Sequence, residues 1–172
     1  MDYTRHYGSK GLKKIECTDY RYQLYRVRWD YQDYKDEHIP SDNMISFVEG
    51  HFKHKPTIDE VKECILAWFN HNIDQDIYSG FTWNGMNIWL STENQFNYKA
   101  AYDLAVQTNG ANLPITFKFG TTEEPNYHTF TTIDELQDFY VKAMAHVNTK
   151  LNEGWAKKDS FDWSEYEAEL AS

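Results

Sequence analysis

The spacing of apolar residues changes from an alternating period to a helical period near residue 56. Between residues 20 and 31, large apolar side chains alternate with polar ones, and the parity of the alternation switches near Leu24. This pattern predicts a strand with an irregularity, such as a bulge, at the switch. Turn-forming residues at 32–43 predict a loop, and a second extended segment follows at 44–52. We therefore expect the first third of the chain to be mostly β.

Helix starts are predicted at three places by the same local motif, the capping box, in which a threonine and a glutamate or glutamine satisfy free backbone donors. The three boxes are Thr57-Ile-Asp-Glu60, Thr92-Glu-Asn-Gln95 and Thr132-Ile-Asp-Glu135. Apolar residues at helical spacing follow each box and predict helices over about 58–78, 92–108 and 133–154. We expect Gly154 to end the last helix.

Two β-hairpins are predicted between these helices. Asn84-Gly85 separates two apolar alternations within 81–90, which is a strong signal for a tight hairpin turn. Residues 114–119 alternate as well, and 127–130 can return as their partner. The sequence thus predicts a β-rich segment at 1–56 and an α-ββ-α-ββ-α unit at 57–172. No linker separates them, so we expect one compact α+β domain.

Charge is distributed unevenly along the chain. Residues 1–56 hold 10 Lys and Arg against 9 Asp and Glu, whereas residues 57–172 hold 7 against 18. Phosphate groups are bound mainly by clustered basic side chains, so we expect no nucleic-acid partner and no anionic membrane partner. No apolar run is long enough to span a bilayer, and the first 14 residues lack a signal-peptide core. We expect a soluble protein in a cytoplasm.

The residues that could carry chemistry do not form a known catalytic motif. The sequence has no phosphate-binding loop, nucleophile elbow or zinc-protease motif, and we predict no enzyme activity and no cofactor. His51 and His54 are the nearest metal-ligand pattern, with Glu49 or His6 as companions. Two histidines three apart in an extended segment do not share a face, so we predict no metal site there. Cys17 and Cys64 have no metal or disulfide spacing and are expected to be free thiols.

A run of arginines in the predicted N-terminal strand offers a possible anion contact. Arg21, Arg26 and Arg28 could project from one strand face, and acidic residues lie close by in the sequence. A solvated face, or one in which charges pair across strands, explains them better.

Exposed aromatic and amide side chains are the best candidates for a binding surface. Trp89 falls on the mixed face of the first hairpin, where it could anchor an interface, stack on a sugar or be covered by the N-terminal strands. Asn94 and Asn97 offer uncharged donors and acceptors. The aromatics after the predicted last helix either fold back on the core or dock on another subunit. The interface candidates are Trp89, Asn94, Asn97, Trp155, Phe161 and Trp163.

Three segments together resemble a known family: residues 80–101, the strand at 116–120, and the helix ending in Asn152-Glu-Gly-Trp155. They resemble a domain of unknown function carried by tailed phages and prophages of gut bacteria, over roughly residues 56–163. In that family a long helix holds a histidine near its middle, here His146. Members sit beside tail-fibre, tail-fibre-assembly and baseplate proteins.

The resemblance implies a virion-associated structural or tail-assembly protein that acts through protein contacts, and it does not imply a catalytic residue. Its partners would be other phage structural proteins or a second copy of the chain, in the virion or the host cytoplasm. Two alternatives stay open, a carbohydrate-binding module and a small phage-encoded enzyme or host-defence antagonist. The first needs aromatics and amides along one groove, and the second needs a pocket where histidine and carboxylate groups converge.

Overall fold

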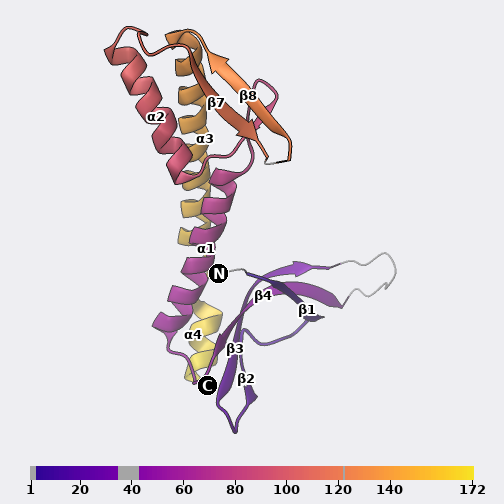
Figure 1. Cartoon of the computed structure of the whole chain (residues 1–172). Helices are drawn as coiled ribbons and strands as arrows, with labels where there is room; N and C mark the ends of the chain where they lie inside the picture. Colours follow the sequence, from indigo (N-terminus) through magenta and orange to yellow (C-terminus); the bar gives the residue numbers. More distant parts are fainter. Residues whose placement is uncertain (1–2, 35–42, 122) are drawn as a thin grey trace. The chain divides into compact units, whose positions relative to one another are not determined.

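The computed structural model describes residues 3–34, 43–121 and 123–172 and confirms an α+β fold (Figure 1). The helices are α1 (Ile58–Tyr78), α2 (Thr92–Gln107), α3 (Ile133–Asp159) and α4 (Ser164–Ala171). The strands are β1 (Arg5–Ser9), β2 (Ile15–Asp19), β3 (Leu24–Asp33), β4 (Met44–Phe52), β5 (Phe81–Trp83), β6 (Met86–Ile88), β7 (Ile115–Gly120) and β8 (Pro125–Phe130). Most of the predicted loop at 32–43 lies outside the described residues.

The chain divides into two compact units. Residues 1–69 and 160–172 form the first, here called the sheet unit, and residues 70–159 form the second, the hairpin unit. The division falls within α1 and again between α3 and α4, whereas the sequence suggested a change of pattern at residue 56. None of the helices in the described ranges combines the length and the apolar character that a membrane crossing requires.

The sheet unit is built on one antiparallel sheet with the strand order β1-β4-β3-β2. The predicted single strand at 20–31 is wrong in its first part, because residues 20–23 form the turn between β2 and β3 and Gln23 has a φ of 53°. The switch of parity at Leu24 therefore marks the start of β3. A bulge does occur in β3, but between Trp29 and Gln32, where Asp30 has a φ of 52°.

One face of this sheet carries the core of the sheet unit. Trp29 and Val48 are buried there with Val61 and Ile65 from α1. Tyr166 of α4 is completely buried in the same core, and its hydroxyl donates a hydrogen bond of 2.8 Å to the backbone carbonyl of Arg28. Packing within the chain thus holds helix α4 in the sheet unit.

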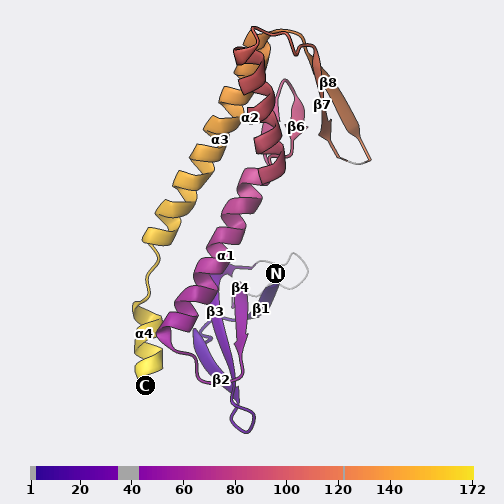
Figure 2. The same cartoon turned by 60° about the vertical axis from the view of Figure 1, so that its left-hand side comes forward.

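The hairpin unit contains both predicted hairpins (Figure 2), and their apolar side chains share one core with those of α2 and α3. In the first hairpin, Phe81 pairs with Ile88 and Trp83 with Met86. Asn84 and Gly85 have φ values of 48° and 75°, as a two-residue turn of the expected kind requires. The core is strongly aromatic, with Trp83, Phe130 and Phe139 in mutual ring contact.

Local capping residues account for the starts of α1 and α2, with one correction at α2. At α1 the predicted box is present, because the Thr57 backbone N–H donates to Glu60 Oε2 at 2.8 Å and the Glu60 N–H donates to Thr57 Oγ1 at 3.3 Å. Helix α2 is capped by Ser91 and not by Thr92. The Ser91 hydroxyl accepts from the Asn94 N–H at 3.3 Å, while Thr92 is already the first helical residue.

The expected helix end at Gly154 is wrong. Helix α3 runs on to Asp159, and Gly154 is a buried residue inside it. The position faces the Ile73 side chain of α1 within the hairpin unit, and a Cβ there would collide with it. This glycine permits a close approach between two helices and does not terminate one.

Both cysteines are free, as the sequence predicts. They are partly buried, and burial together with the negative charge of Glu63 raises the pKa of the Cys64 thiol. A thiol with a raised pKa is a poor nucleophile at neutral pH, so Cys64 is suited to packing.

Candidate functional site

A groove in the hairpin unit lies between helix α2 and strand β7, with a volume of about 590 Å³. Its α2 wall includes Asn94, Asn97 and Leu104, and its β7 wall includes Phe117 and Lys118. The remaining lining residues are Tyr98, Ala100, Ala101, Asn112 and Ile115. We call this hollow, together with the one described next, the α2–β7 groove.

A second hollow of about 410 Å³ shares Asn94, Tyr98 and Lys118 with the first and extends to Trp89. Its other lining residues are Phe119, Gly120 and Thr121 at the end of β7. Three interface candidates from the sequence, Trp89, Asn94 and Asn97, therefore line this one groove.

The turn into α2 holds these side chains in place. Asn94 Nδ2 donates a hydrogen bond of 2.8 Å to the Trp89 carbonyl, and Gln95 Nε2 donates one of 2.7 Å to the Leu90 carbonyl. The Trp89 ring lies 5.6 Å from that of Tyr78, yet 48% of the residue remains exposed. The support for the Trp89 ring within its own unit comes from Tyr78. The Trp89 indole is available to a ligand.

Tyr98 anchors the groove to the aromatic core. Its ring contacts Phe117 at 4.9 Å and Phe139 at 5.0 Å. Burial raises the pKa of Tyr98 to about 12, so its hydroxyl stays protonated at neutral pH. None of the lining residues, all of which the structure describes, carries a carboxylate or an imidazole. A ligand in the groove could stack on its aromatic rings, form hydrogen bonds with its amide side chains and pair with the positive charge of Lys118.

The other three interface candidates lie elsewhere. Trp155 is on α3, 51% exposed, and does not line the groove. Phe161 and Trp163 belong to the sheet unit, where Phe161 lies 5.5 Å from the Phe69 ring and the Lys62 ammonium sits 5.8 Å from the Trp163 ring centroid. Contacts within the chain therefore take up part of the surface of Phe161 and Trp163, and their role in association stays a prediction.

On the sheet face opposite the core of the sheet unit, charged side chains pair across the strands. Arg28 is almost fully buried and donates from Nε to Glu49 Oε2 at 2.9 Å, while its Nη1 pairs with Glu16 at 2.8 Å. Arg26 pairs with Glu49 Oε1 at 3.1 Å. The predicted cross-strand pairing holds for Arg26 and Arg28, whereas Arg21 lies in the β2–β3 turn and not in a strand.

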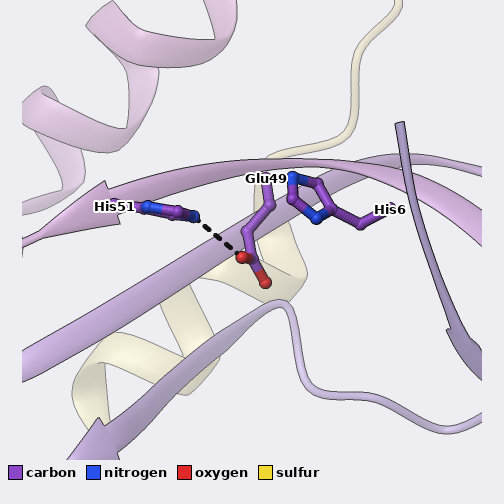
Figure 3. A group of neighbouring side chains, drawn as sticks. All are labelled: His6, Glu49 and His51. Atoms are coloured by element: carbon purple, nitrogen blue, oxygen red, sulfur yellow. Dashed lines mark hydrogen bonds and ion pairs between the residues drawn. The ribbon is translucent and has the colours of Figure 1, made fainter. Parts of the chain in front are cut away.

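Glu49 is the centre of this charged face. Burial raises its pKa, but hydrogen bonds from Arg28 and His51 and the charges of both arginines outweigh burial and leave the pKa below its ordinary value. His51 Nε2 lies 2.9 Å from Glu49 Oε1, and His6 of β1 lies on the other side of the carboxylate (Figure 3). The sequence paired His51 with His54, but the structure separates them, because His54 bonds to Glu60 at 2.8 Å beside the start of α1.

Sequence reasoning missed Tyr98 and Lys118 as groove residues. Tyr98 was one of many aromatics at helical spacing, and nothing in the linear sequence relates Lys118 to Asn94. Only the packing of β7 against α2, through the contact of Tyr98 with Phe117, brings them to one surface.

Fold and site define an α+β protein with an open groove between a helix and a β-hairpin. The chain belongs to the family described as Domain of unknown function (DUF4376), which matches residues 60–171. That range contains the whole α2–β7 groove and leaves out His6, Glu49 and His51. A comparison with curated proteins and one with solved structures found no match.

Proposed function

We propose that this chain is a non-enzymatic binding protein that contacts another protein through the α2–β7 groove, as a structural or tail-assembly protein of a phage virion. The observation that carries the proposal is the gathering of Trp89, Asn94 and Asn97 on one groove. The proposal that this is a phage protein rests on the resemblance to domains encoded beside tail-fibre and baseplate proteins.

The physical character of the groove supports a protein partner. A half-exposed tryptophan with its backbone fixed by Asn94 is the kind of rigid aromatic anchor on which interfaces depend. Leu104 is also about half exposed and adds apolar surface at the other end of the groove. Lys118 favours a partner segment that carries an acidic side chain near its apolar contact.

Carbohydrate binding is a second candidate function, and a specific observation favours it. Sugars are bound by aromatic faces flanked by amide donors and acceptors, and Trp89 and Asn94 line one hollow. The same residues therefore serve either ligand, and the two functions need to be separated by experiment.

The test for a protein partner uses the full chain with a photo-crosslinking residue at Asn97, expressed in phage-infected cells. We expect a crosslink to a phage structural protein, identified by mass spectrometry, that is lost in the Trp89→Ala variant. Tyr127→Ala is the matched control, because Tyr127 is 65% exposed on β8 and does not line the groove.

A glycan array probed with the same three proteins separates the alternatives. Glycan binding that Trp89→Ala removes and Tyr127→Ala keeps, without a protein crosslink, would replace the protein partner by a carbohydrate. If neither a crosslink nor glycan binding depends on Trp89, the groove is not the binding site and the proposal fails.

A further inference from the structure

A site of a different kind lies in the sheet unit, and it goes beyond the proposed function. His6 of β1 pairs in register with Phe47 of β4, so it shares a sheet face with Glu49 and His51, two and four residues further along β4. The ligand atoms of these three residues all lie within 4.8 Å of one another. Figure 3 shows the Glu49 carboxylate between the two imidazole rings.

The donor set suits a transition-metal ion. Two imidazoles and one carboxylate are a common set for Zn²⁺ and for Fe²⁺, and they leave further coordination positions for water. Ligand atoms about 2.0–2.2 Å from one ion are roughly 3 Å from each other when they occupy neighbouring positions. The 2.9 Å between His51 Nε2 and Glu49 Oε1 has that spacing.

Neighbouring residues hold two of the three donors in position. Arg28, which is almost fully buried, keeps its hydrogen bond to Glu49 Oε2 and so orients the carboxylate with Oε1 toward His51. The His6 ring stacks on Phe47 at 6.1 Å between ring centroids. His51 is the exposed member, with 57% of its side chain accessible, and gives an ion a route from solvent.

Arg26 occupies the space that an ion would take. Its Nη1 pairs with Glu49 Oε1 and also contacts His51 Nε2. An arginine and a metal ion compete for the same lone pairs. The Arg26 side chain is 32% exposed, so it can turn into solvent when an ion enters, whereas Arg28 remains in place.

We propose that His6, Glu49 and His51 bind one divalent first-row transition-metal ion, with Zn²⁺ as the probe. The ion would join β1, one of the two edge strands of this sheet, to the neighbouring strand β4. Binding would therefore stabilise the edge of the sheet as well as create a coordination site open to solvent.

The experiment titrates Zn²⁺ into the untagged full-length protein by calorimetry and repeats the titration with Co²⁺, whose visible spectrum reports the ligands. We expect one ion per chain, and at least a tenfold loss of affinity in His6→Ala and in His51→Ala. His54→Ala is the matched control and should bind like the wild type, because His54 is paired with Glu60 away from the cluster.

An Arg26→Gln variant gives a second test that does not depend on removing a ligand. Without the competing guanidinium it should bind Zn²⁺ more tightly than the wild type, and the folded state of every variant is checked by circular dichroism. The proposal is overturned if the wild type shows no saturable binding. It is also overturned if His6→Ala and His51→Ala bind as the wild type does, or if Arg26→Gln does not raise the affinity.

Discussion

The backbone of Gly154 in α3 lies directly against the Ile73 side chain in α1, with no room for a Cβ between them. Both residues belong to the hairpin unit and are buried. Glycine inside a helix is less favourable than alanine by about 1 kcal/mol. Its presence at this position is explained by close packing, which would be lost if the two helices moved apart.

Gly154→Ala should therefore destabilise the protein, by about 1–3 kcal/mol, because the added methyl group overlaps Ile73. Without that contact, the same change would stabilise the helix by about 1 kcal/mol, so the sign of the effect is diagnostic. Urea unfolding measures it. In an Ile73→Ala background the cost of Gly154→Ala should shrink, and a gain in stability in the wild-type background would contradict the contact.

Gly85→Val should lower the free energy of unfolding by on the order of 1 kcal/mol or more, since Gly85 has a φ of 75°. No atom lies within 4 Å of a Cβ placed there, so the loss would come from backbone strain alone. Thr82→Val, on the exposed side of β5, is the control and should change stability by less than about 0.5 kcal/mol. An unchanged denaturation midpoint for Gly85→Val would count against the turn.

Two aromatic residues near the C-terminus, Tyr166 and Trp155, should differ in how much they contribute to stability. Tyr166→Ala removes a fully buried ring and its hydrogen bond to Arg28, and should cost about 3–5 kcal/mol. Trp155→Ala, at a half-exposed position, should cost far less and, if Trp155 contributes to association, should alter the oligomeric state. Thermal unfolding and size-exclusion chromatography measure the two effects. Equal destabilisation by both changes would disagree with the packing of α4.

Stability should fall above pH 10 in part because of Tyr98. Burial raises the pKa of Tyr98 to about 12 in the folded protein, whereas an unfolded tyrosine has a pKa of about 10. The unfolded state therefore loses this proton first, and stability that is complete below pH 10 is lost as the pH rises toward 12, by roughly 2 kcal/mol for this residue.

Tyr98→Phe should flatten the alkaline limb of the stability profile, measured by urea unfolding between pH 8 and pH 12. Tyr31, whose pKa burial also raises to about 12, should leave a residual slope. Tyr127→Phe, at an exposed position, is the control and should keep the wild-type profile. A Tyr98→Phe profile parallel to that of the wild type would refute the assignment.

The sequence by itself determined the elements whose hydrogen bonds and backbone angles are local. Helix α1 begins and ends where the spacing predicted, with its Thr57 and Glu60 cap in place. The Asn84-Gly85 turn and strand β4 are likewise where the pattern indicated. For α1 and the turn, residues within a few positions of one another supply the interactions, so the linear pattern contains the information. For β4 the pattern gave the position of the strand, but its hydrogen-bond partners lie in β1 and β3.

Tertiary structure alone decided the features that depend on residues from separate elements. Gly154 continues a helix because Ile73 packs on it, although an isolated glycine signals a helix end. The groove exists because β7 packs beside α2 and brings Lys118 to Asn94. His6 reaches Glu49 only through the pairing of β1 with β4. Strand pairing and core packing set these distances, and neither has a signature in residue spacing along the chain.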